Sequence, residues 1–565
     1  MKEQHYPIGA AGRSMKRKSN FRYALVGQGA VIGLITGLII SLFRLFLHLA
    51  DSLRDRMVGF AHQGLLPAVL VALILLLIAL AVAAILRFEP ESTGSGIPQV
   101  EAELRGKKDM CWWKVILAKF AGCGIAIGGG LALGREGPSI QIGAMVGKGY
   151  AKCFHRMLTE ERLLMSCGAG AGLAAAFGAP LAGAMFCLEE LHKNFSLDVL
   201  VSTLSATVAA DFVAANIMGL TPVFGFDIEH SLPLRYYWAV IVLGVILGFF
   251  GAFYNRTLAF MQDLFDRIAA AAEAAVSRFS NPSRRRISPK TGKLAFASGA
   301  GRRAKLIAAF AMAYVCYFAY PLTLGSGNSL VGEISAGRYA LGALAVLLVV
   351  KFVFSTASFG STAPGGIFLP LLVLGAITGG MFTRVLGALI GFDQKYIASF
   401  VVLAMAAYFA AIVQAPVTGV ILITEMTGDF TSLLPMVLAS LIAYIISELA
   451  GAEPIYTQLM NRSGDTRYPK AHERKSIVDE EVHYGSYMDG RMVMEMGLPI
   501  GALIVSVLRG EEEFIPDGHT ILRGGDVIEL LMRESDIADV EDVLQKRCKS
   551  VYVKDDAADD KGSRL

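Results

Sequence analysis

The sequence predicts an all-α polytopic membrane protein, built from an inverted-topology duplicated repeat with many broken helices and followed by a small α+β cytoplasmic C-terminal domain. Three observations support this prediction. The chain has 565 residues, of which 54% are apolar and only 18% are charged, whereas soluble domains carry about 25% charged residues. Short motifs of glycine and proline recur at nearly one spacing. After residue 456 the composition becomes that of a soluble domain.

The apolar segments are long enough to cross a bilayer. Leu65 to Leu86 is a stretch without a charge, which is sufficient for roughly 30 Å of hydrocarbon, and the mean hydropathy of the chain is +0.53. Further apolar runs lie near 24–49, 115–133, 163–188, 199–220, 236–260, 306–324, 340–359, 366–391, 398–424 and 432–450. Several of these are short or are interrupted by Gly, Pro or a charge, so we expect full spans mixed with broken helices.

Three motifs recur in the same order in the two halves of this region. Gly-Ser-Gly at 94–96 returns at 325–327, the Gly and Pro pattern of 134–147 returns at 366–379, and Ala-Pro with a later Glu, 179–189, returns at 415–425. Single matches are weak in a chain with 60 glycines, but three matches in register are specific. The membrane part, 22–456, is therefore predicted to be a duplication of about 22–230 and 235–456.

Positive charge sets the orientation of the two halves. Basic residues precede the first span, so residues 1–21 are predicted to be a cytoplasmic N-terminal segment, and we expect both termini to be cytoplasmic. The first span of the second half instead runs into a basic loop: Arg278, Arg284, Arg285, Arg286, Arg302 and Arg303. Equivalent spans then run in opposite directions, which is typical of transporters whose site lies at the repeat interface.

Three motifs are typical of helices that begin inside the membrane. They are Gly-Ser-Gly-Ile-Pro at 94–98, Gly-Arg-Glu-Gly-Pro at 134–138 and Gly-Gly-Ile-Phe-Leu-Pro at 365–370. Glycine allows exposed, tight backbone and an early proline suits the first helical turn. Converging helix starts with free N–H groups favour an anion. The alternative is that the glycines only allow close helix packing.

Glu136 lies in the apolar stretch from Val115 to Ala151. A carboxylate at that depth costs on the order of 3 kcal/mol, so we expect it to have a function. An ionised carboxylate is itself an anion and can occupy an anion site, and protonation should release it. Arg135 either pairs structurally or adds positive potential.

These motifs, together with Glu-Pro-Ile-Tyr at 453–456, resemble the CLC family of chloride channels and proton-coupled chloride exchangers. The resemblance covers about 22–456 and implies the CLC fold and a homodimer in the lipid bilayer of the cell membrane, with one ion pathway per subunit. It implies that the hydroxyls of Ser95 and Tyr456 and the N–H groups of Ile367 and Phe368 bind the central chloride. Glu136 then corresponds to the gating and external proton glutamate.

Glu190 falls where exchangers of this family keep an internal proton glutamate. Its neighbour Glu189 matches Glu425 in the repeat, so we expect both of these to be structural, whereas Met426 occupies the position that matches Glu190. The resemblance therefore implies a secondary active antiporter that exchanges chloride for protons. The alternative is a passive voltage- or ligand-gated chloride channel. The intact Gly-Ser-Gly motif favours chloride over fluoride, and Gln99 stands where related bacterial transporters carry Glu.

Other classes lack support in the sequence. A cation channel would need a carbonyl-lined filter such as Thr-Val-Gly-Tyr-Gly, and an intramembrane enzyme would need a nucleophile with its base or a metal cluster. Neither pattern is found in the sequence. We expect no enzymatic activity, no metal, no cofactor and no nucleic acid polymer as a partner, and we expect the seven cysteines to be reduced and structural.

The C-terminal part is predicted to be a linker, 457–474, a regulatory domain, 475–546, and a disordered tail, 547–565. We expect strands near 477–482, 502–508 and 527–532, a short helix at 489–496 and a helix at 535–546. The segment 498–531 resembles the TrkA-C ligand-binding domain of potassium-uptake regulatory proteins. The resemblance implies a small-molecule regulator, such as cyclic di-AMP or another nucleotide. The alternative is a module that stabilises a dimer.

Overall fold

The computed structural model describes residues 8–106, 108–193, 195–225, 232–279, 299–462, 475–498, 502–510 and 512–533. The chain divides into two compact units, Met1–Ser463 and Gly464–Leu565. The predicted helix at 535–546 and the predicted tail at 547–565 lie outside the described residues.

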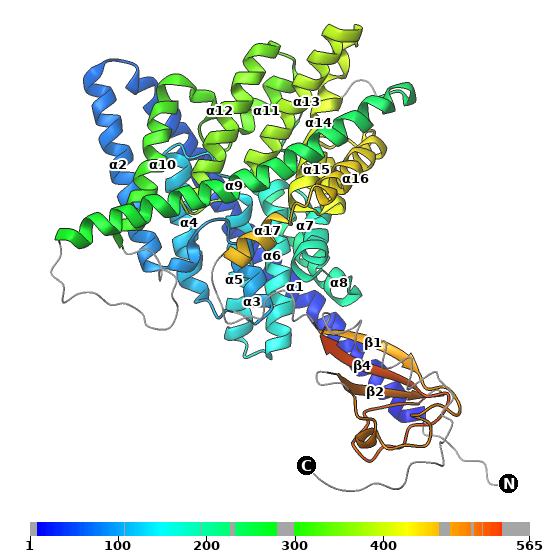
Figure 1. Ribbon diagram of the computed structural model, residues 1–565. Coiled ribbons are helices and arrows are strands. Elements are labelled where there is room, and N and C mark those ends of the chain that lie inside the picture. Colours follow the sequence, from blue (N-terminus) through cyan, green and yellow to red (C-terminus); the bar gives the residue numbers. More distant parts are fainter. Residues whose placement is uncertain are drawn as a thin grey trace, which may run out of the picture. The chain divides into compact units, whose positions relative to one another are not determined.

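The first unit is a bundle of helices (Figure 1), and the two halves of its sequence contain matching elements. The first half contains α1 (Ile8–Ala61), α2 (Leu65–Phe88), α3 (Ile97–Leu104), α4 (Trp112–Gly128), α5 (Glu136–Cys153), α6 (Leu158–Phe177), α7 (Pro180–Phe186), a π-helical turn (Cys187–His192) and α8 (Leu197–Met218). The second half contains α9 (Tyr237–Phe279), α10 (Gly299–Ala319), α11 (Asn328–Ser335), α12 (Leu341–Gly360), α13 (Phe368–Ile390), α14 (Ile397–Val413), α15 (Pro416–Thr427) and α16 (Leu433–Leu449). The short α17 (Ile455–Arg462) follows and packs against α3.

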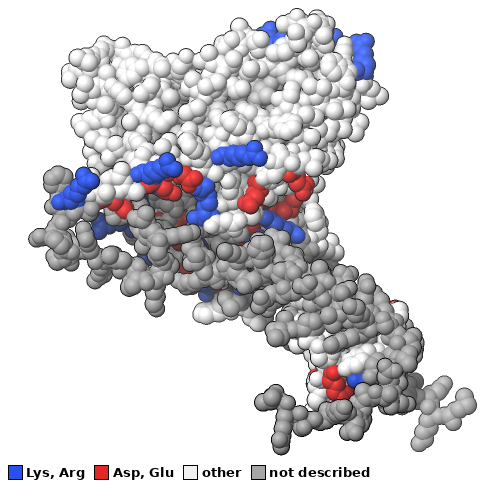
Figure 2. Space-filling model, in the orientation of Figure 1, with Lys and Arg blue, Asp and Glu red and all other residues white. Residues whose placement is uncertain are grey.

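Seven of the described helices are long and apolar enough to cross a membrane. The remainder are shorter, as the predicted broken helices require. The apolar runs at 163–188 and 398–424 each form two helices, because Pro180 and Pro416 begin α7 and α15 and proline cannot continue a preceding helix. Figure 2 shows a largely uncharged face above a band of charged side chains. On α9, the part before Arg256 likewise carries no charge.

Repeat-related glutamates tie the two halves together. The carboxylate of Glu189 accepts hydrogen bonds from the N–H groups of Val417 and Thr418, at 3.2 and 2.7 Å. In the mirror arrangement, Glu425 accepts from the N–H groups of Leu181 and Ala182, at 3.0 and 2.8 Å. Each carboxylate thus caps the first turn of the short helix, α15 or α7, in the opposite half. The predicted structural role of these two glutamates is confirmed.

A single pair of glycines marks the axis that relates the repeats. Gly134 and Gly366, which are equivalent in the duplication, form an antiparallel bridge, and each donates its N–H to the carbonyl of the other at 2.7 Å. Two equivalent residues can pair with each other only at the axis that exchanges the halves. Both helices that follow, α5 and α13, begin two residues later. The repeat axis therefore passes through the segments that the sequence indicates as an anion site.

The second unit contains a four-stranded antiparallel sheet in the order β1-β4-β2-β3. The strands are β1 (Lys475–Glu481), β2 (Leu503–Arg509), β3 (Glu512–Phe514) and β4 (Val527–Arg533). The expected strands at 477–482, 502–508 and 527–532 are confirmed, and β3 was not expected. The expected helix at 489–496 is wrong: only a 3-10 turn, Val493–Glu495, forms there, because Gly490 adopts a φ of 81° and Met492 bridges to Ile521 instead.

Asp526 is a buried anchor of this sheet. Arg509 donates to it from Nε and Nη2, at 2.8 and 2.7 Å, and the N–H of Arg523 donates at 2.8 Å. Burial alone would raise the pKa of Asp526, but these hydrogen bonds outweigh it and hold the pKa below its ordinary value. The contribution of the ionised Asp526 carboxylate to the free energy of unfolding is therefore fully present above the unfolded-state pKa of about 4. It is lost as the pH falls through the folded-state pKa.

We expect Asp526→Asn to destabilise the second unit by about 1.5–3 kcal/mol, the range for a hydrogen bond to a charged group. Amide hydrogen exchange of the full chain at pH 7 measures this, and protection should fall in β2 and β4 while α5 and α13 are unaffected. The wild type should lose the same protection when the pH falls below about 4. Equal protection in both proteins at pH 7 would show that the ion pair adds nothing.

Candidate functional site

Glu136 begins α5, and its side chain is fully buried. Gly134 and Gly366 lie directly beside the carboxylate, and a Cβ atom at Gly366 would come within 3.1 Å of one carboxylate oxygen. The N–H groups of Arg135 and Leu369 are also near it, but neither oxygen makes a hydrogen bond within the described residues. A buried charge without full hydrogen bonding is costly. Such an environment favours a carboxylate that gains a proton or moves out of the buried position.

Three helix N-termini meet at this point. The Gly134–Gly366 bridge joins the starts of α5 and α13, and the N–H of Gly365 donates to the carbonyl of Gly94 at 2.9 Å, which adds the segment before α3. The first N–H groups of a helix have no acceptor within the helix and lie at the positive end of its dipole. Their convergence makes an environment that favours an anion without a full positive charge.

The expected chloride-binding residues of α3 and α13 lie at these helix starts. Ser95 is buried next to the first turn of α5, where a Cβ atom at Gly137 would lie 2.6 Å from the Ser95 carbonyl oxygen. Its hydroxyl accepts the N–H of Ile97 at 3.1 Å. Ile367 and Phe368 are the N-cap and first residue of α13 and are buried, so their N–H groups belong to the unpaired set at that end.

Tyr456 approaches the same region from α17. Its side chain is fully buried, and its hydroxyl has no hydrogen-bond partner within the described part of the chain. Glu190 and Glu136 both act electrostatically on this hydroxyl, which places it near both carboxylates. A buried hydroxyl normally finds a partner, so this donor is available for a ligand.

Glu190 lies in the π-helical turn that ends the α7 segment, with 3% of its surface exposed. One of its carboxylate oxygens has no hydrogen-bond partner among the residues described. Single π-helical turns occur frequently at functional sites, because the extra residue redirects the side chains. Here the turn separates two adjacent carboxylates: Glu189 accepts hydrogen bonds from α15, whereas Oε1 of Glu190 has no such partner in the described ranges.

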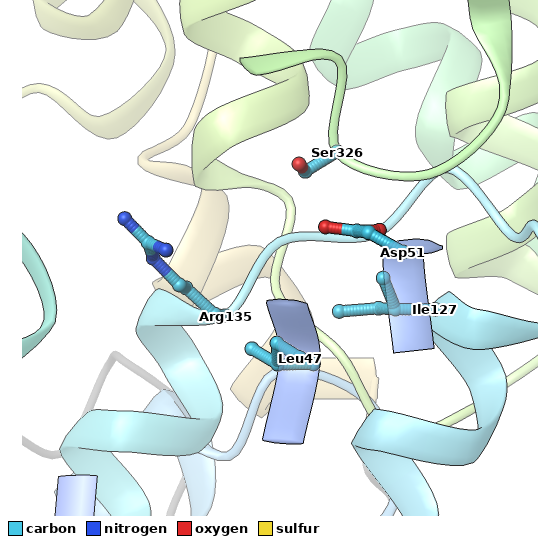
Figure 3. A pocket seen from close by; sticks show the side chains of 5 residues that line it. All are labelled: Leu47, Asp51, Ile127, Arg135 and Ser326. Carbon is cyan, nitrogen blue, oxygen red and sulfur yellow. The ribbon is translucent and has the colours of Figure 1, made fainter. Parts of the chain in front are cut away.

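Arg135 makes no ion pair within 4 Å in the described ranges, so its side chain is not held by a salt bridge. Its guanidinium lies over the ring of Phe177 at 5.6 Å. It also lines a small pocket with Asp51, Ser326, Leu47 and Ile127 (Figure 3). Arg135 and Asp51 interact electrostatically. Of the two roles left open by the sequence, positive potential next to Glu136 is therefore the better supported.

Two buried lysines were missed by the sequence reasoning. Lys119 and Lys351 have no exposed surface and are equivalent in the duplication. Lys119 donates to the carbonyls of Ser92 and Gly94 at 3.0 and 2.7 Å, and Lys351 donates to those of Thr323 and Gly325 at 2.9 and 2.8 Å. Each ammonium therefore fastens one Gly-Ser-Gly turn. The common 232-residue offset of the two lysines was the signal that could have identified them.

We expect Lys119→Met and Lys351→Met each to lower the thermal unfolding temperature in detergent, because each removes a charged hydrogen-bond donor from two carbonyls, and a hydrogen bond to a charged group contributes about 1.5–3 kcal/mol. Only Lys119→Met should also weaken chloride binding in calorimetry, because its turn contains Ser95. If both variants weaken chloride binding equally, the lysines act through general stability and not through the turn that each one holds.

The fold and site together define a membrane transporter of the inverted-repeat class, with paired helix starts suited to an anion and a buried carboxylate at the repeat axis. The chain belongs to the CLC family: residues 77–448 match the family described as Voltage gated chloride channel. Residues 477–545 match the TrkA-C domain, which agrees with the antiparallel sheet of the second unit.

Several relatives share most of the chain. The sequence is 32% identical over 464 residues to the H(+)/Cl(-) exchange transporter ClcA of Vibrio parahaemolyticus, covering 81% of this chain and 94% of that protein. It is 34% identical to the protein of the same name in Vibrio cholerae, covering 79% of this chain and 91% of the relative.

Solved structures show the same fold. A slow cyanobacterial Cl-/H+ antiporter superposes with a TM-score of 0.69 at 28% identity, covering 79% of this chain and 99% of that one. A CLC-type fluoride/proton antiporter gives a TM-score of 0.57 at 21% identity, covering 76% and 96%.

Proposed function

We propose that the protein exchanges chloride for protons across the cell membrane as a secondary active antiporter. The observation that carries this proposal is the arrangement of two buried carboxylates, Glu136 and Glu190, that both act on the hydroxyl of Tyr456. A passive channel needs only the anion path, whereas exchange needs proton-carrying groups beside it. The relatives and the structural neighbour are named as exchangers or antiporters, which supports the same function.

Each site residue has a proposed role. Chloride binds centrally, where the hydroxyls of Ser95 and Tyr456 and the N–H groups of Ile367 and Phe368 donate to it. Glu136 occupies the outer anion position while ionised and leaves it when protonated, because protonation removes the charge that the helix starts attract. Glu190 receives the proton from the cytoplasmic side. The chemistry supplied by this chain is therefore anion coordination and proton transfer, without a cofactor.

Proteoliposomes loaded with chloride test the exchange. When chloride flows out down its gradient, protons should accumulate inside against their own gradient, and protein-free vesicles should show no such movement. Chloride efflux with no proton uptake at any pH would replace the proposal by the passive channel. Repeating the assay with fluoride tests the proposed preference for chloride.

We further propose that the protein works as a homodimer with cytoplasmic termini. Each chain carries a full set of the proposed site residues, so each subunit would have its own pathway. Limited cross-linking in membranes tests the dimer, and accessibility of an N-terminal tag in right-side-out and inverted vesicles tests the orientation. A protein that stays monomeric at every cross-linker concentration would contradict the proposed homodimer.

The second unit is proposed to bind a small regulatory ligand. The support is the match to the TrkA-C domain, and cyclic di-AMP is the first ligand to test. Calorimetry with the full chain should show heat on adding cyclic di-AMP, and exchange rates in proteoliposomes should change with it, while a chain ending at residue 463 should not respond. A full chain that gives neither heat nor a change in rate would leave the domain as a dimer-stabilising module.

A further inference from the structure

Lys193 lies where three parts of the site meet. It directly follows the π-helical turn of Glu190, and its backbone is left-handed with a φ of 54°. Its ammonium donates a hydrogen bond to the hydroxyl of Thr457 at 3.1 Å and lies 3.7 Å from the carboxylate of Glu101. Thr457 follows Tyr456 on α17, and Glu101 belongs to α3, the helix that begins after Ser95. One side chain thus contacts the helices of both chloride-binding hydroxyls.

Glu190 is surrounded by charged groups, of which Lys193 is one. Lys193, Glu101, Glu189 and Arg105 act electrostatically on Glu190, and the effect of Lys193 is the largest of the four. Glu101 is 1% exposed and also pairs with Arg105. One carboxylate oxygen of Glu101 and one of Glu190 have no hydrogen-bond partner within the described residues. The two carboxylates therefore share the field of one ammonium.

We propose that Lys193 is a positioning residue that links the charge of Glu190 to the helix that carries Tyr456. This inference rests on the proposed exchange of chloride and protons. When Glu190 is ionised, it competes with Glu101 and Thr457 for the ammonium. When Glu190 holds a proton, the ammonium is held by Glu101 and Thr457 alone, and α17 is fastened to α3. A proton on Glu190 thereby restrains Tyr456 and, through its hydroxyl, the central chloride.

The competition of Glu190, Glu101 and Thr457 for the Lys193 ammonium involves small free energies. The Lys193 side chain is 33% exposed, so solvent screens its ion pair and the contact is easily exchanged. A link of this strength cannot hold the fold together, but it can bias which of two arrangements of α17 is populated. The left-handed backbone at Lys193, with a φ of 54°, ends the π-helical turn.

Lys193→Gln in the full chain tests the link, with the number of protons moved per chloride in proteoliposomes as the readout. We expect this ratio to fall by about threefold, the scale of a partly exposed ion pair, while chloride turnover is unchanged or raised. Lys193→Arg keeps the charge and should keep the ratio. Thr457→Val removes only the hydroxyl and should lower the ratio in the same direction. The double variant Lys193→Gln with Thr457→Val should be no worse than Lys193→Gln alone, because both changes break one link.

Arg462 supplies the matched control. It lies on the same helix, α17, and forms an ion pair with Asp263 of α9, so Arg462→Gln removes a cation and a tie of α17 without approaching Glu190. This variant should keep the wild-type ratio. If it lowers the ratio as much as Lys193→Gln does, the effect is a general loosening of α17 and the inference is overturned.

Two further outcomes overturn it. One is a wild-type ratio in both Lys193→Gln and Thr457→Val, and the other is a Lys193→Arg variant that behaves like Lys193→Gln. If Lys193→Gln does not fold, Thr457→Val with its partly exposed side chain still decides the question. A wild type that moves chloride but no protons contradicts the proposed function instead, so the two failures are distinguishable.

Discussion

Replacing Glu136 by glutamine is expected to abolish proton movement while chloride still flows. The carboxamide has the shape of the protonated acid but carries neither a charge nor a transferable proton, so it neither competes with chloride nor carries a proton. Proton uptake driven by a chloride gradient should fall by about a hundredfold or more, the range that positioned acid–base groups contribute. Chloride flux in the variant should also lose its dependence on pH, whereas in the wild type it should rise as the pH falls.

Glu333 offers a control for this variant. It lies partly exposed on α11, accepts a hydrogen bond from the hydroxyl of Tyr339, and is not one of the proposed site residues. Glu333→Gln should exchange as the wild type does. Proton uptake that persists in Glu136→Gln would show that protons take a route that does not include this carboxylate.

Replacing Glu190 by glutamine is expected to have an effect of similar size on protons and little effect on chloride. The side chain is buried in a π-helical turn and does not belong to the helix starts that we propose bind chloride. Loss of its exchangeable proton should remove the proposed cytoplasmic proton station and leave the proposed chloride path intact. Measuring chloride efflux and proton uptake in the same vesicles separates the two fluxes.

The neighbouring glutamate provides the sharpest comparison. Glu189 accepts hydrogen bonds from Val417 and Thr418 of α15, so Glu189→Gln should weaken the join between the two halves by about 1–3 kcal/mol. It should lower the unfolding temperature and keep proton coupling, and Glu425→Gln should match it. The opposite assignment, with coupling lost in Glu189→Gln and kept in Glu190→Gln, would contradict the roles given to this pair.

Much of the membrane fold could be predicted because the duplication repeats its motifs in register. Matching glycines at 134 and 366 predicted equivalent helix starts, and the structure joins these same two residues across the repeat axis. The pairing itself could not be predicted, because sequence spacing does not say which equivalent segments meet. The same limit applies to Glu189 and Glu425. Their structural role was expected, but the sequence did not predict that each caps a helix of the opposite half.

Residues that act through backbone contacts were the ones missed. The roles of Lys119 and Lys351 were not predicted, because their partners are backbone carbonyl groups, which every residue has. The contact of Lys193 with Thr457 could not be predicted from the sequence either, since it depends on α17 packing against α3. In the second unit, the expected helix at 489–496 failed because a glycine with positive φ and a bridge to Ile521 override local helix propensity.

The most direct test of coupled exchange is the reversal point of chloride flow in proteoliposomes. The chloride gradient at which net flow stops is measured at two different pH gradients, with the membrane potential held constant. Coupled exchange predicts that this point moves with the pH gradient, because each chloride must be accompanied by protons moving the other way. A reversal point that stays at the chloride equilibrium at both pH gradients would mean that chloride moves alone and that Glu136 and Glu190 do not carry protons.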